Sequence, residues 1–157
     1  KDVDVIIDLM IHDIDLALYL NGPVKSLDSY GVKNNGLISF AIATLHHNSG
    51  AYSRILASRI TERKIRKIEV TASDFFASVD LISKTLKLHK QSSIKSSEKE
   101  SYTLSSVEEE IIVKNKEPLL SELVTFANVC KKIPTDYPNL IDGIKSQEIS
   151  EKINNNI

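Results

Sequence analysis

The sequence predicts an α+β fold, with one open and mostly antiparallel β-sheet of about six strands and helices on one face. Three observations lead to this fold class. The chain opens with a helical pattern, its apolar residues then alternate with a period of two, and two further helical patterns close it. Because tight turns join consecutive strands, antiparallel pairing is expected. With 157 residues, the chain has the size of a single α+β domain over 1–157.

The opening helix is predicted over 5–20. Asp4 is suited to cap its amino end, because a short acidic side chain accepts hydrogen bonds from free backbone N–H groups. Gly22 and Pro23 follow the last apolar residues, and glycine followed by proline is typical of a helix end.

The sheet is predicted from alternation and from turn signals. Asn35-Gly36 is a strong hairpin signal, and the polar segment 46–50 predicts a second turn. Strands are therefore expected over 24–32, 37–45, 51–58, 65–72, 77–89 and 107–113. The segment 91–106, rich in Ser, Lys and Glu, is either a long loop or the solvated ends of a β-ribbon.

Two helices are predicted to close the chain. Pro118 suits the first position of one of them, and Cys130 lies on its apolar stripe and is expected in the core. Asn139 is suited to cap the other helix.

Composition excludes several classes of function. The 20 basic and 21 acidic residues give a net charge of −1, which disfavours nucleic-acid binding. The sequence contains no run of about 18 apolar residues, so no membrane span is predicted. The single cysteine fits a reducing compartment, so a cytoplasmic protein is expected. Neither G-x-G-x-x-G nor G-x-x-x-x-G-K follows a predicted strand, so this segment is not expected to bind a nucleotide through such a loop.

The most informative feature is a polar line on the opening helix. At about 100° per residue, the spacing i, i+4, i+7 and i+11 places four polar side chains on one stripe between apolar faces. They are Asp8, His12, Asp15 and Tyr19. An imidazole near neutrality can take a proton from a hydroxyl, and a carboxylate one turn away can orient it. The pair therefore suits alcohol oxidation or hydrolysis.

Other interpretations of these residues stay open. Asp8 could be a first-turn carboxylate favoured by the helix dipole, and His12 a hydrogen-bonded core histidine. A metal site that adds His46 or His47 is a further alternative, although its spacing matches no strong zinc pattern. The basic segment 59–67 is expected to be a solvated strand edge.

The stretch Asp8-Leu-Met-Ile-His-Asp-Ile-Asp15 resembles the D-x-x-x-H-x-x-D helix of the glucose–fructose oxidoreductase / inositol dehydrogenase (Gfo/Idh/MocA) family. Later stretches keep the family's order, including 40–45, Ala57-Ser58-Arg59 and 117–126. The Gly-Gly that usually precedes the motif is replaced by Val3-Asp4. The resemblance implies the C-terminal domain of a two-domain dehydrogenase, whose N-terminal Rossmann domain is missing from this chain.

This resemblance also implies a function. His12 would be the acid/base for hydride transfer between a sugar, polyol or nucleotide-sugar hydroxyl and NAD or NADP, which the missing domain would mainly bind. Asp8 would contact substrate or orient His12, and Asp15 would be structural. Lys64 or Arg66 would contact an anionic group of the substrate, and no metal is implied.

The resemblance has two further consequences for the chain as a whole. A homo-oligomer through the sheet face is implied, and the isolated chain is expected to be inactive. The alternative function is a non-catalytic oligomerisation or ligand-sensing domain that uses the same sheet.

Overall fold

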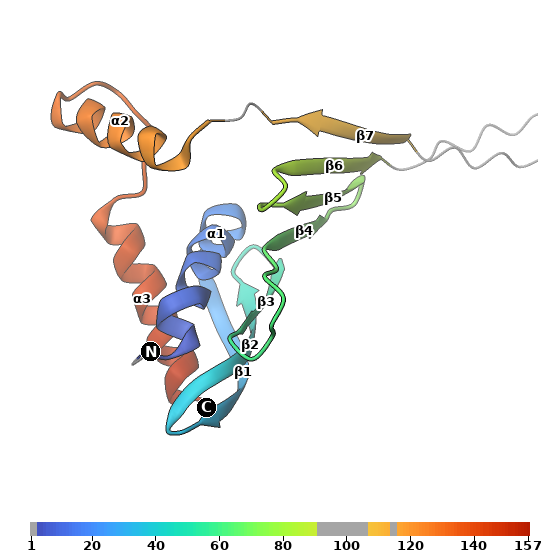
Figure 1. Cartoon of the computed structure of the whole chain (residues 1–157), viewed down its shortest axis with the longest axis vertical. Coiled ribbons are helices and arrows are strands. Elements are labelled where there is room, and N and C mark those ends of the chain that lie inside the picture. The colour runs from blue at the N-terminus through green and yellow to red at the C-terminus, as the bar shows by residue number, and fades with distance from the viewer. Residues whose placement is uncertain (1–2, 91–106, 114–115) are drawn as a thin grey trace, which may run out of the picture. The chain divides into compact units, whose positions relative to one another are not determined.

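The computed structural model describes residues 3–90, 107–113 and 116–157. These residues divide into two compact units. The first unit combines Lys1–Glu62 with Asp136–Ile157, and the second is Arg63–Thr135. The segment 91–106, predicted as a loop or ribbon end, lies outside the described residues. Figure 1 labels the α-helices and strands of both units.

The first unit contains a three-stranded antiparallel sheet in the order β1-β2-β3. Its strands are β1 (Val24–Asn34), β2 (Leu37–His47) and β3 (Tyr52–Ser58). Asn35 and Gly36 join β1 to β2 with φ of 52° and 81°, the left-handed values that this two-residue turn requires. All three predicted strands of this unit are confirmed.

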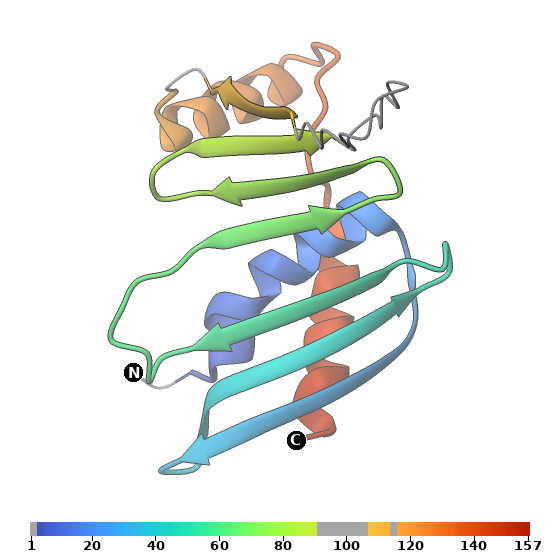
Figure 2. The ribbon, with the colours of Figure 1, turned by 90° about the vertical axis from the view of Figure 1, so that its right-hand side faces the viewer.

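Helices pack on one face of this sheet (Figure 2). They are the π-helical turn η1 (Ile6–Met10), α1 (Ile11–Asn21) and α3 (Leu140–Asn155). The buried apolar side chains that they share with the sheet are Val5, Ile6, Met10, Ile14, Ala17, Ile38, Ala41, Ala43, Leu45, Ile55, Ala57, Ile149 and Ile153. Small alanines at the centre of β2 leave room for the larger helix side chains above them.

The ends of the opening helix agree only in part with the prediction. Gly22 ends α1 with a φ of 79°, as predicted. The prediction that Asp4 caps the helix is wrong, because the cap position is Val5, which makes no side-chain bond. The Asp4 carboxylate instead accepts a hydrogen bond from the Ile38 backbone N–H, at 2.6 Å, and so ties the chain to β2.

The second unit contains a four-stranded antiparallel sheet in the order β4-β5-β6-β7. Its strands are β4 (Lys67–Thr71), β5 (Phe75–Asp80), β6 (Thr85–Lys90) and β7 (Val107–Ile112). The single strand predicted over 77–89 is wrong, because β5 and β6 form a hairpin there. The Asp80 carboxylate accepts hydrogen bonds from the backbone N–H groups of Ser83 and Ile82. These bonds hold the pKa of the Asp80 carboxyl below 3.8, and the bond from Ser83 has the larger effect. The carboxylate thus stabilises the turn.

The helix of the second unit is α2 (Pro118–Cys130). Pro118 occupies its first turn as predicted, and Glu117 caps it by accepting from the Leu119 and Leu120 backbone N–H groups. No residue of α2 is buried. Cys130 is exposed, so its predicted core position is wrong. An apolar stripe indicates that a helix face can pack against another surface, but the stripe does not identify that surface.

The predicted α+β class is confirmed. The described residues place seven strands in two antiparallel sheets, where the sequence predicted about six strands in one sheet. None of the helices in the described part of the chain has both the length and the hydropathy that a membrane crossing requires.

Candidate functional site

The candidate site begins in the π-helical turn η1, which carries Asp8. The Ile11 backbone N–H donates to the Ile6 carbonyl, five residues back, which widens the helix at this point. Such π-turns inside α-helices are frequent at functional sites. The regular 100° spacing assumed from the sequence therefore does not hold between Asp8 and the α-helical residues that follow.

Arg59 pairs with Asp8. Its Nη2 lies 2.5 Å from Asp8 Oδ2, and its Nη1 donates to the Val3 carbonyl. The Arg59 backbone N–H donates to the Ser39 carbonyl at 2.9 Å, which fixes the residue directly after β3. The Arg59 side chain is only 16% exposed, against 47% for Asp8.

The sequence prediction missed Arg59, which it grouped with the solvated basic segment 59–67. That interpretation holds for Arg63, Lys64 and Arg66, which are exposed. Nothing local distinguishes Arg59 from these residues, because its partners are 51 and 56 positions away along the chain. The Ala57-Ser58-Arg59 stretch that resembles the family was the one available signal.

His12 lies in the first turn of α1, with an exposed side chain. Among the described residues, no hydrogen bond or ion pair to its ring is formed. The alternative that His12 is a core histidine is therefore wrong. Its imidazole is accessible to a ligand, and Asp8 precedes it by four residues on the same helical segment.

The core histidine of this chain is His47, which is 3% exposed. Its Nδ1 lies 2.7 Å from the Gly22 carbonyl oxygen and its Nε2 lies 2.8 Å from Ser53 Oγ. Because a carbonyl can only accept, Nδ1 carries a proton and donates it to the Gly22 carbonyl. His47 thus joins the end of α1 to β3.

The metal alternative combined Asp8, His12 and Asp15, with His46 or His47 as a further ligand. His46 pairs instead with Asp28, at 3.2 Å, and lies edge-on to the Tyr52 ring. Across residues 3–90, 107–113 and 116–157, no group of three or more His, Cys, Asp or Glu side chains could hold a metal ion.

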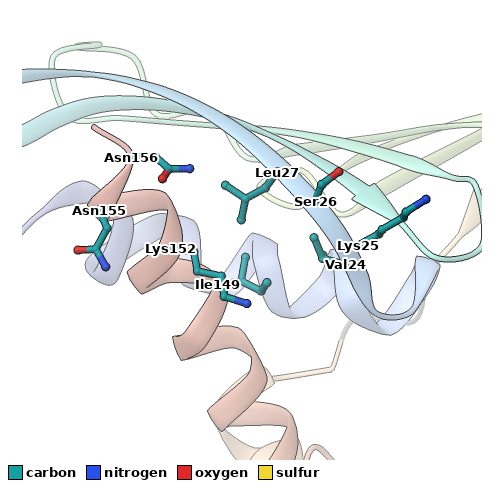
Figure 3. A pocket seen from close by; sticks show the side chains of 8 residues that line it. All are labelled: Val24, Lys25, Ser26, Leu27, Ile149, Lys152, Asn155 and Asn156. Atoms are coloured by element: carbon teal, nitrogen blue, oxygen red, sulfur yellow. The ribbon is translucent and has the colours of Figure 1, made fainter.

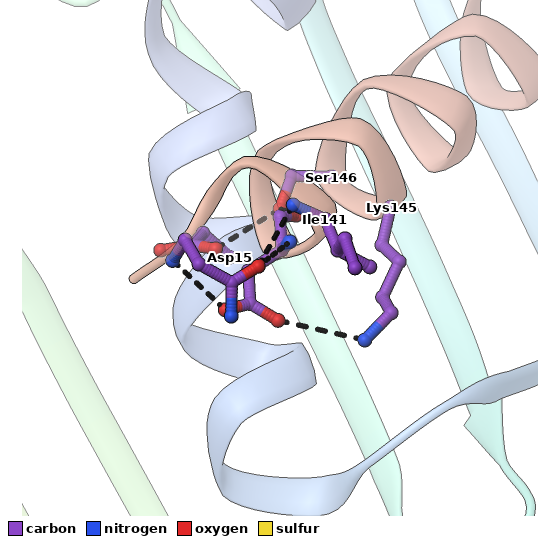
Figure 4. A network of polar contacts seen from close by, with 6 residues as sticks. Asp15, Ile141, Lys145 and Ser146 are labelled. Atoms are coloured by element: carbon purple, nitrogen blue, oxygen red, sulfur yellow. Dashed lines mark hydrogen bonds and ion pairs between the residues drawn. The ribbon is translucent and has the colours of Figure 1, made fainter. Parts of the chain in front are cut away.

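Asp15 and Tyr19, the other two members of the polar line, face a different part of the first unit. Asp15 accepts a hydrogen bond from the Ser146 hydroxyl of α3, at 3.0 Å (Figure 4). Both residues line a cavity of about 620 Å³ between the end of α1 and the segment 136–145. The structure therefore separates the line into Asp8 and His12, which are exposed, and Asp15 and Tyr19, which line this cavity, with Tyr19 itself 77% exposed.

A smaller cavity of about 310 Å³ lies between β1 and the end of α3 (Figure 3). Lys25 and Lys152 line it together with Asn155 and Asn156. None of the residues predicted for the site takes part in it.

Lys64 and Arg66, predicted as substrate contacts, belong to the second unit. Both side chains are exposed in the segment before β4, and the Arg66 carbonyl accepts from the Leu81 backbone N–H at 3.0 Å. Their predicted role stays a prediction.

Comparison with known proteins gives one family match. Residues 3–74 match the family model described as GFO/IDH/MocA C-terminal domain. The UDP-N-acetylglucosamine 3-dehydrogenase of Acidithiobacillus ferrooxidans is 36% identical over 92 residues, which are 56% of this chain and 29% of that protein.

Solved structures share the fold of the chain. The UDP-N-acetylglucosamine 3-dehydrogenase GnnA from Acidithiobacillus ferrooxidans matches 99% of this chain and 48% of its own, with a TM-score of 0.86 at 24% identity. The WlbA dehydrogenase from Bordetella pertussis, in complex with NADH and UDP-GlcNAcA, matches 99% of this chain and 43% of its own, with a TM-score of 0.67 at 15% identity. This chain thus spans about half the length of these solved proteins.

Proposed function

Residues 3–74 of this chain belong to the Gfo/Idh/MocA C-terminal domain family, and we propose that the chain is the substrate-side domain of an NAD(P)-dependent oxidoreductase. The observation that carries this proposal is the exposed His12, four residues after an Asp8 that Arg59 holds in a π-helical turn. An accessible imidazole can exchange a proton with a substrate hydroxyl, and a carboxylate held on the same helical segment can orient the imidazole or bind the substrate.

The cofactor is held mainly outside this chain in our proposal. The 157 residues contain no glycine-rich phosphate loop after a strand, and the solved relatives are about twice as long. An N-terminal Rossmann domain fits both facts. When bound, the nicotinamide supplies the chemistry of accepting or returning a hydride.

The residues of this chain handle the proton of the same reaction. During alcohol oxidation the substrate carbon loses its hydride, the hydroxyl oxygen loses its proton to His12, and a carbonyl forms. In the reverse direction His12 returns that proton to the oxygen. Asp8 orients the imidazole or binds a neighbouring substrate hydroxyl, and Arg59 keeps the carboxylate in place.

A nucleotide sugar is the substrate class that we favour. The curated relative acts on UDP-N-acetylglucosamine by its name, and WlbA was solved with UDP-GlcNAcA. Lys64 and Arg66 would then supply cations for the anionic part of the substrate.

Assembly through the open sheet face is the second part of the proposal. Tyr30, Ile42 and Leu56 form one cross-strand row on the face opposite the helices, and Val32 and Phe40 pair in the next row. We call these five residues the apolar sheet patch. Tyr30 is 66% exposed and Leu56 is 58% exposed, and exposed apolar patches of this kind mark protein–protein interfaces. The patch also favours the alternative of a non-catalytic assembly domain, so activity has to be measured.

The experiment is an activity assay of the full-length protein that contains this chain. Purified protein is incubated with NAD⁺ or NADP⁺ and with UDP-N-acetylglucosamine, N-acetylglucosamine, glucose or inositol, and formation of NAD(P)H is followed by absorbance. We expect turnover with a nucleotide sugar. The 157-residue chain alone is expected to be inactive, and tight stoichiometric NAD(P)H binding by it would contradict our placement of the cofactor. A full-length protein that turns over no member of the panel but still assembles would favour the alternative.

A further inference from the structure

Arg59 connects three parts of the first unit through different atoms. Its backbone N–H bonds to Ser39 of β2, its Nη1 donates to the carbonyl of Val3, and its Nη2 lies 2.5 Å from the carboxylate of Asp8. Val3 stands just before the π-helical turn, and Asp8 stands inside it. One guanidinium therefore holds both the entry to the turn and the turn itself against the end of β3.

The burial of Arg59 separates it from an ordinary surface ion pair. An ion pair between two exposed, long side chains holds neither side chain firmly in place, because water competes for both partners. The Arg59 side chain is only 16% exposed, and within the described residues its Nε is buried and makes no hydrogen bond. Burying a polar atom without a hydrogen-bond partner costs free energy. Other contacts of the same guanidinium must therefore offset the burial of Nε. These are the contacts of Nη1 and Nη2 at the π-helical turn.

We propose that Arg59 is a positioning residue for the candidate acid/base site. It fixes the Asp8 carboxylate and the π-helical turn, and so sets the direction in which the next turn presents His12. This inference rests on the proposed function, in which His12 exchanges a proton with the substrate. Arg59 itself touches neither substrate nor cofactor in this account.

The planar fork of arginine suits this role better than lysine would. Two nitrogens of one guanidinium can donate in fixed directions to the Val3 carbonyl and the Asp8 carboxylate at once. A lysine ammonium keeps the charge but is a single donor centre on a mobile stem. Arg59→Lys should therefore keep part of the wild-type kcat that Arg59→Met loses.

The test uses the full-length protein and a double-mutant cycle. The variants are Arg59→Met, Arg59→Lys, Asp8→Asn and the double variant of Asp8→Asn with Arg59→Met. The matched control is Arg54→Met, which removes an exposed arginine from β3. For each variant, kcat and KM are measured, together with amide hydrogen exchange over residues 5–12.

We expect Arg59→Met to lower kcat by about 10- to 100-fold with little change in KM, because misplacing a reacting group slows the reaction without removing a substrate contact. Arg59→Lys should show a smaller loss. In the Asp8→Asn background, Arg59→Met should cause little further loss, because the two residues act as one unit. Amide exchange in the π-helical turn should become faster in Arg59→Met and stay at the wild-type rate in Arg54→Met.

Two results would overturn the inference. The first is that Arg59→Met lowers kcat by the same factor in the wild-type protein and in the Asp8→Asn variant, since Arg59 would then act independently of Asp8. The other is unchanged amide exchange over residues 5–12 in both Arg59 variants. A wild-type protein without dehydrogenase activity would reject the proposed function instead, and the exchange data would still decide whether Arg59 holds the turn.

Discussion

The Asp15 carboxylate of α1 accepts a hydrogen bond from the Ser146 hydroxyl of α3 at a distance of 3.0 Å (Figure 4). Ser146 is 2% exposed, and its hydroxyl also lies 3.1 Å from the Asp142 carbonyl one turn earlier in α3. The contact joins the helix that carries the candidate site to the last helix of the chain. This contact supports the structural role that the resemblance implied for Asp15, and that role, like the proton transfer by His12, stays a prediction.

Ser146→Ala should lower the free energy of unfolding by about 1–3 kcal/mol, because it removes the donor to a partly buried carboxylate. Chemical denaturation monitored by circular dichroism measures this difference. Glu148→Ala, on the exposed side of the same helix, is the control and should change stability by less than about 0.5 kcal/mol. Equal midpoints for Ser146→Ala and wild type would show that the bond does not stabilise the pairing of α1 with α3.

The amino end of α3 should weaken in acid. The Asn139 backbone N–H donates to the Asp142 carboxylate at 3.0 Å, and this bond, assisted by Lys145, holds the pKa of Asp142 below its ordinary value of 3.8. A lowered pKa in the folded state means that the ionised carboxylate stabilises the fold above the unfolded pKa. This stabilisation is lost as the pH falls through the folded value.

Asp142→Asn tests this pH dependence, because it keeps an acceptor but removes the charge. The variant should be less stable than wild type at neutral pH, and the difference should shrink as the pH falls below about 3.8. Denaturation midpoints over a series of pH values measure it, with Glu148→Gln as the control. A difference that stays constant across the series would contradict the assignment.

The apolar sheet patch predicts a change in assembly. Leu56→Glu places a charge in the centre of the patch, and it should weaken self-association by about tenfold or more if the patch is an interface. Sedimentation equilibrium at several protein concentrations measures the association constant. Leu140→Glu, which changes an 80% exposed leucine at the start of α3, is the control. Equal association of both variants and wild type would place the interface elsewhere.

The helix end at Gly22 and the three strands of the first unit could be predicted from the sequence. Their causes are local: a glycine with positive φ ends the helix, and the Asn35-Gly36 turn with alternating residues sets the strands. The hairpin turn between β5 and β6 was missed, because the apolar Leu81 and Ile82 continue the strand pattern through it. Asp80 and Ser83 were the signal of that turn, since the Asp80 carboxylate bonds to the Ser83 backbone.

The site could be predicted only in part. Asp8 and His12 were found because their spacing on a helix is visible in the sequence. The π-helical turn and Arg59 were not found, since they depend on contacts between distant segments, such as Asp4 with Ile38 and Arg59 with Asp8. No periodicity within a single segment encodes such contacts.

The most direct test of the proposed function is kcat of His12→Ala in the full-length protein, with the substrate that supports NAD(P)H formation. His46→Ala is the control, because it removes a half-exposed imidazole that pairs with Asp28 on the sheet. We expect His12→Ala to lower kcat by about 10² or more, the usual contribution of a general base, and His46→Ala to leave it unchanged. A wild-type kcat in His12→Ala would contradict the account, since His12 would then take no part in proton transfer.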